Sequence, residues 1–91
     1  MFRLWAREFR ENHMLRDIVI EDGGTDTRTH KIFRAVDSVC HEFDLGQPIW
    51  LDSCVRDFKA HDKTRFYQDS FIEQIPFDYL EIQVIEEDQT W

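Results

Sequence analysis

The residue types that could bind an anion or attack a substrate gather in one stretch of the sequence, "DSCVRDFKAHDKTRF". A cysteine in the first turn of a helix is a candidate nucleophile, and histidine, lysine and arginine side chains bind anions. These residue types would suit a small ligand-binding or enzymatic pocket beside the second predicted helix and the segment 62–78. The candidate pocket residues are Cys54, His61, Lys63 and Arg65.

A structural explanation competes with the pocket. Lys59, His61 and Lys63 fall in or just past the last turn of a predicted helix, where cations complement the unpaired carbonyl groups. That explanation needs no ligand, and Asp62 supplies a local counter-charge. Arg65 lies beyond the helix end, so its partner has to be sought elsewhere in the fold.

No motif in the sequence specifies a reaction. The metal-ligand types Cys40, His41, Cys54 and His61 lack the paired spacing of a zinc site. Neither a glycine-rich phosphate loop nor a Gly-x-Ser-x-Gly sequence is present. We therefore expect a protein without catalytic residues, metal or cofactor, and two reduced cysteines.

Composition and charge restrict the classes of function. The 91 residues predict one domain, 1–91, and 42% hydrophobic and 14% aromatic residues predict a folded chain. The formal net charge is -8, and residues 67–91 hold seven Asp or Glu and no Lys or Arg, so we expect no nucleic-acid partner. The absence of a long apolar run and of a signal-peptide pattern predicts a cytoplasmic protein without a membrane segment.

Hydrophobic periodicity predicts three strands and two helices. Alternation of period two over 2–9, 14–22 and 78–87 indicates strands, the first two forming a hairpin that turns near Asn12. The helices are expected from Arg28 to about Phe43 and from Cys54 to His61. This order, β-β-α-α-β, predicts an α+β fold: a three-stranded antiparallel sheet of order 2-1-3 with both helices packed on one face.

Helix boundaries and the buried helix stripe follow from local residue types. Thr25, Asp26 or Thr27 could cap the first helix, and Asp52 with Ser53 could cap the second. Gly46 is expected to take the left-handed turn after the first helix. The stripe expected to face the core is Ile32, Phe33, Val36, Val39, Cys40 and Phe43.

A sheet covered on one side leaves its other face open. Strand parity places aromatic, aliphatic and charged residues together there, which is the composition of interface hot spots, although single exposed apolar residues are also ordinary. The leading hypothesis is a non-enzymatic interaction module that forms a homo-oligomer or binds a protein partner through this face. The alternatives are the ligand-binding or enzymatic pocket and an acidic mimic of nucleic acid. The expected interface residues are Arg3, Trp5, Arg7, Val19, Tyr79, Glu81 and Ile85.

Three stretches carry a resemblance. "DTRTHKIFRAVDSVCHEFDLGQPIWLDS", "KTRFYQDSF" and "FDYLEIQVIEED" are similar to a group of short bacterial proteins to which no activity is assigned. The likeness extends over nearly the whole chain. It implies a small bacterial domain, agrees with the cytoplasmic prediction and identifies no catalytic residue.

Overall fold

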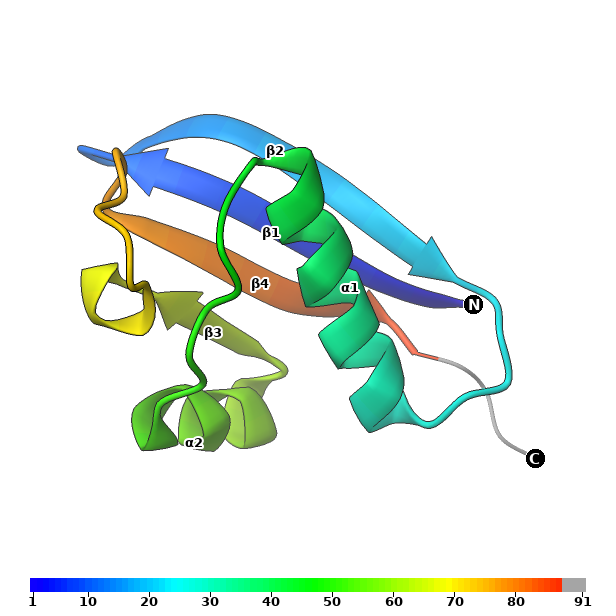
Figure 1. Ribbon diagram of the computed structural model, residues 1–91. Helices are drawn as coiled ribbons and strands as arrows, with labels where there is room; N and C mark the ends of the chain where they lie inside the picture. The colour runs from blue at the N-terminus through cyan, green and yellow to red at the C-terminus, as the bar shows by residue number, and fades with distance from the viewer. Residues whose placement is uncertain (88–91) are drawn as a thin grey trace.

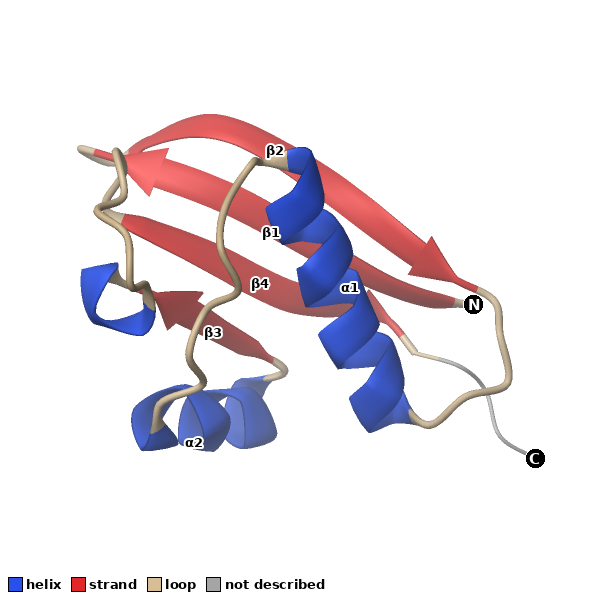
Figure 2. Cartoon of the chain, viewed as in Figure 1, coloured by secondary structure: helices blue, strands red, loops and turns tan. Residues whose placement is uncertain are grey.

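The computed structural model describes residues 1–87 as a four-stranded sheet with two α-helices. All neighbouring strands are antiparallel, in the order β2-β1-β4-β3 (Figure 1). Both helices lie on the same side of the sheet (Figure 2). The elements are β1 (Phe2–Arg10), β2 (His13–Asp22), α1 (Arg28–Glu42), α2 (Asp52–His61), β3 (Lys63–Phe66), a 3₁₀ turn (Gln68–Ser70) and β4 (Tyr79–Glu86).

The α+β class with two helices and an antiparallel sheet is confirmed, but the predicted number of strands is wrong. The last strand, β4, lies beside β1, as expected. β3 is an additional fourth strand, on the side of β4 away from β1. β3 pairs with β4 from Lys63 opposite Gln83 to Phe66 opposite Leu80. Its four residues show too little alternation to indicate a strand, and Lys63 had an explanation as a helix-end charge.

The β1–β2 hairpin follows from a tight turn with the expected turn residue. Glu11 and Asn12 both have positive φ, 52° and 66°, which is the backbone of a two-residue hairpin turn matched to the twist of the strands. Arg10 pairs with His13 on either side of it. The Glu11 amide also donates a hydrogen bond of 2.8 Å to Asp78, which fastens the turn to the segment before β4.

Local side chains set the ends of α1. The Thr27 hydroxyl accepts a hydrogen bond of 3.2 Å from the His30 amide, so one of the three predicted caps is used. At the other end Asp44, with φ of 55°, takes the left-handed conformation that was expected of Gly46. Phe33 is a second correction, because 51% of its surface is exposed and it lies outside the buried stripe.

The start of α2 differs from the prediction. Leu51 is the N-cap residue and makes no side-chain capping bond, while Asp52 already lies in the first helical turn. At this position its negative carboxylate is stabilised by the positive end of the helix dipole. The helix ends at Asp62, whose φ of 54° turns the chain directly into β3.

The core lies between the helices and the inner side of the sheet. Strand residues of one parity are buried there, as the alternation predicted: Phe2, Leu4, Ala6, Leu80, Ile82 and Val84. The buried carboxylate of Glu8 links the sheet to α1 through Arg16. Glu8 accepts hydrogen bonds from the Arg16 guanidinium, which also donates to the Phe43 carbonyl at 2.9 Å. This contact ties the end of α1 to the hairpin.

Candidate functional site: the outer face of the sheet

The side of the sheet away from the helices forms an open face, called the outer face below. No helix among residues 1–87 covers it (Figure 2). The seven predicted interface residues all belong to the strand positions that alternate with buried ones. With their neighbours, the outer-face residues are Arg3, Trp5, Arg7, Phe9, Asp17, Val19, Glu21, Lys63, Arg65, Tyr79, Glu81, Gln83, Ile85 and Glu86.

Glu81 lies at the centre of the outer face and joins three strands. Its two carboxylate oxygens accept hydrogen bonds from Arg7 at 2.6 Å and from Arg65 at 2.8 Å. Only 4% of Glu81 is exposed, so its charge is buried between the two guanidinium groups. The pKa of Arg65 is raised above its ordinary value, most of all by a hydrogen bond to Tyr67 and next by the hydrogen bond to Glu81. Arg65, whose partner could not be derived from sequence, therefore belongs to this face.

Aromatic rings stack with these arginines. The Arg7 guanidinium lies 3.8 Å from the centroid of the Trp5 ring, and that of Arg65 lies 4.5 Å from the Tyr79 ring. Tyr79 in turn stacks on Phe9 at 5.2 Å between centroids. The Trp5 indole donates a hydrogen bond of 2.8 Å to Asp17. The face is therefore a connected array of rings and charges that crosses the whole sheet.

The predicted ligand pocket is divided by the fold. Three of its residues, His61, Lys63 and Arg65, line one open hollow of about 300 Å³ between α2 and β3. Cys54 instead points into the interior, where its sulfur lies 3.7 Å from the Arg65 carbonyl and 3.9 Å from the Ser70 hydroxyl. The hollow therefore has cationic groups at its rim and no thiol within it.

Both cysteines are reduced and buried. Burial raises the pKa of the Cys40 thiol to about 11, because the thiolate is poorly solvated there. A thiol with this pKa is almost entirely protonated at neutral pH. Cys40 is thus a packing residue of α1 and a poor nucleophile.

Cys40 should make the stability of the fold depend on alkaline pH. The thiol ionises near pH 9 in the unfolded chain and near pH 11 in the folded one, so stability is complete below pH 9 and declines as the pH rises to about 11. The loss amounts to at most about 2–3 kcal/mol. Urea unfolding of the wild-type and Cys40→Ala proteins between pH 8 and 11 measures it. All other titrating groups are common to the two proteins. If their unfolding free energies changed equally with pH, the raised pKa of Cys40 would be contradicted.

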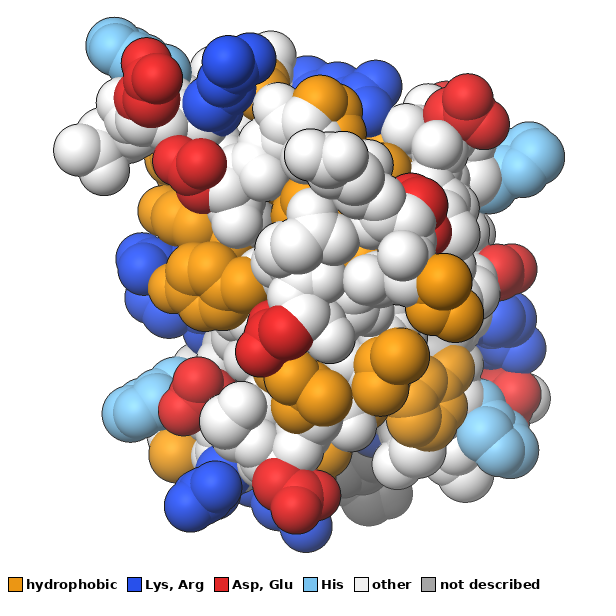
Figure 3. Space-filling model, turned by 60° about the vertical axis from the view of Figure 1, so that its left-hand side comes forward, with side chains coloured by type: hydrophobic (Ala, Val, Ile, Leu, Met, Phe, Trp, Pro, Cys, Tyr) orange, Lys and Arg blue, Asp and Glu red, His pale blue; other side chains and the backbone are white. Residues whose placement is uncertain are grey.

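The carboxylates show no arrangement in a single ridge on the face that Figure 3 displays. Acidic side chains there are dispersed among basic, hydrophobic and neutral ones (Figure 3). Several carboxylates are also engaged by arginines: Asp22 and Asp26 with Arg34, and Asp62 and Glu87 with Arg28. A surface that imitates the phosphates of nucleic acid would need its negative charges aligned and accessible.

Residues 1–87 contain no cluster of three or more His, Cys, Asp or Glu side chains arranged to bind a metal ion. Neither helix in that range is long and apolar enough to cross a membrane. Comparison with protein-family models, with curated proteins and with solved structures finds no match to this chain.

Proposed function

We propose that the protein is an interaction module that associates with a second copy of itself through the outer face of the sheet. The observation that carries this proposal is the connected array of arginines and aromatic rings around Glu81, on a face that neither helix of residues 1–87 covers. Trp, Tyr and Arg are the residues most enriched in interface hot spots. Here their side chains are already held by stacking and hydrogen bonds, so association would cost little side-chain entropy.

Charge favours association through this face over other surfaces. The whole chain has a formal charge of -8, so two copies repel each other in most orientations. On the outer face four cations match four carboxylates, which leaves no formal charge. The cations are Arg3, Arg7, Lys63 and Arg65, and the carboxylates are Asp17, Glu21, Glu81 and Glu86.

A patch with both signs of charge can also be self-complementary. In a two-fold dimer the same surface of each copy meets the other, so every cation needs a carboxylate elsewhere in the patch. Arg3 and Glu21, 3.2 Å apart near one end of the sheet, are partly exposed and could exchange partners across such an interface. Val19 and Ile85 supply exposed apolar surface beside them.

Sedimentation velocity tests the proposal. The wild-type protein should be mainly dimeric at about 100 µM, and Val19→Glu should weaken the dimer at least about tenfold, because it places an unpaired charge in the interface. Val19 is 37% exposed in the monomer, so the substitution leaves the fold intact. Ile72→Glu is the matched control and should change nothing, because Ile72 is 91% exposed and is not one of the outer-face residues. A wild-type monomer at this concentration, or equal effects of the two variants, would overturn the proposal.

A further inference from the structure

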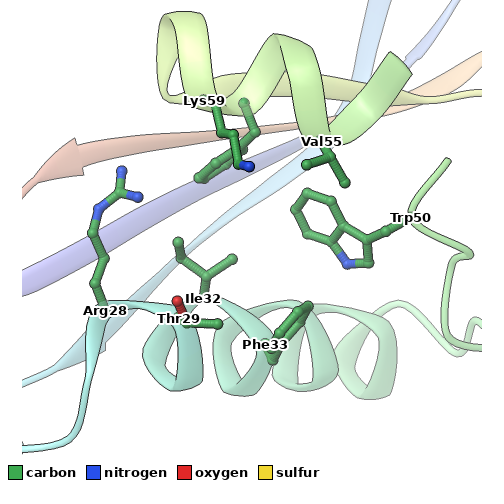
Figure 4. A pocket seen from close by; sticks show the side chains of 8 residues that line it. Arg28, Thr29, Ile32, Phe33, Trp50, Val55 and Lys59 are labelled. Carbon is green, nitrogen blue, oxygen red and sulfur yellow. The ribbon is translucent and has the colours of Figure 1, made fainter. Parts of the chain in front are cut away.

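A cleft lies between the two helices, on the opposite side of the sheet from the outer face. Its volume is about 180 Å³, similar to the roughly 150 Å³ of an apolar cavity that binds benzene. Figure 4 shows side chains of α1 and α2 facing each other across it, with Trp50 at one end and Arg28 at the other. Its apolar walls are formed by Ile32, Phe33, Trp50, Val55 and Phe58.

The aromatic walls of the cleft are fixed by ring contacts. The Trp50 ring meets the edges or faces of Phe33, Phe58 and Phe66 at centroid distances of 5.9, 5.6 and 5.0 Å. These near-perpendicular contacts hold the indole in one orientation. Phe33 nevertheless leaves 51% of its surface exposed, beside the cleft. The cleft is thus a preformed apolar site that is open to a ligand.

Two cations border the cleft, and they differ in their partners. Arg28 donates hydrogen bonds to Asp62 at 2.6 Å and to Glu87 at 2.8 Å, so two carboxylates more than offset its single positive charge. Lys59 forms no ion pair or hydrogen bond with any residue from 1 to 87. Figure 4 shows its amine pointing from α2 into the space between the two helices.

We infer that the cleft binds a small aromatic carboxylate, with the ring between Phe33, Trp50 and Val55 and the carboxylate on the Lys59 amine. The volume suits one six-membered ring, and the aromatic walls offer edge-to-face contacts. The overall charge of -8 disfavours anions in general, so a preference for an anionic ligand must arise from the local lysine. This inference is independent of self-association, which uses the other side of the sheet.

A titration followed by NMR tests the inference directly. The probes are 3-phenylpropionate and its uncharged analogue 3-phenylpropanol. We expect the carboxylate to shift the indole N–H signal of Trp50 with a Kd of about 0.1–1 mM, and the alcohol to bind at least about threefold more weakly. Equal affinity for the two probes would overturn the role of Lys59. A Trp50 signal that does not move by about 20 mM probe would overturn the site itself.

Two variants and a control separate the parts of the inference. Lys59→Met keeps the apolar stem and removes the charge, so it should reduce carboxylate affinity about threefold and leave alcohol affinity unchanged. Val55→Phe fills the cleft and should abolish binding of both probes. Lys63→Met removes an exposed charge outside the cleft and should have no effect. If Lys63→Met reduced carboxylate affinity as much as Lys59→Met does, net charge rather than the cleft would control binding.

Discussion

Phe66→Ala is expected to lower the free energy of unfolding by about 3–5 kcal/mol. Phe66 is fully buried on the inner side of β3, the strand that the sequence did not indicate. Its ring contacts Trp50 edge-on at 5.0 Å, so the substitution leaves a cavity between β3 and the segment that precedes α2. Loss of these contacts should also loosen α2, which packs against β3.

Urea unfolding monitored by circular dichroism measures the loss. The matched control is Ile72→Ala, which removes a side chain that is 91% exposed and should change stability by less than about 0.5 kcal/mol. If the unfolding free energy falls with urea concentration at the wild-type slope while the urea midpoint is lower, the substitution changes stability alone. A loss below about 1 kcal/mol for Phe66→Ala would mean that β3 does not pack on the core as described.

A strand could be predicted from the sequence only where its period-two alternation is long enough to repeat. β1, β2 and β4 run for eight to ten residues, long enough for an alternation of apolar and polar residue types to repeat. Burial alternates along β1 and from Asp17 onward in β2, whereas in β4 the buried Glu81 interrupts it. β3 has only Thr64 and Phe66 on its inner side, so its alternation is repeated once. Its stability as a strand comes from pairing with β4, a contact between segments distant in sequence that periodicity does not reveal.

The candidate surfaces were predictable to different degrees. Strand parity placed Arg7 and Glu81 on one face, because alternation alone determines which side of a sheet a residue faces. Arg65 could not be placed there until β3 was known. The cleft was not predicted at all: helical periodicity put Phe33 in the buried stripe, but periodicity gives the direction of a side chain and not how far the core extends. Trp50, in a segment without regular structure, completes the cleft through tertiary packing.

Glu81→Gln is expected to lower the free energy of unfolding by about 2–3 kcal/mol, because the amide oxygen can accept from only one of the two guanidinium groups while the amide NH2, itself a donor, faces the other. The amide keeps the size of the side chain, so packing is preserved. Arg7 has few other partners: its Nη2 also donates to Gln83 at 2.9 Å, and its buried Nε has no acceptor among residues 1–87. The guanidinium would therefore be left partly buried without a counter-charge.

Glu21→Gln provides the matched control on the same face. Glu21 pairs with Arg3 at 3.2 Å, but the Glu21 side chain is mostly exposed and that of Arg3 is partly exposed, so the same substitution should cost less than about 0.5 kcal/mol. Salt distinguishes the two sites further. A surface pair is screened within the roughly 4 Å Debye length of 0.5 M salt, whereas the effect of Glu81→Gln should persist because the pair is buried. Equal losses at the two positions, or disappearance of the Glu81 effect in salt, would show that Glu81 is an ordinary surface charge. Its retention in salt would instead identify the Arg7–Glu81–Arg65 group as the fixed centre that joins β1, β4 and β3 and orders the outer face before any partner binds.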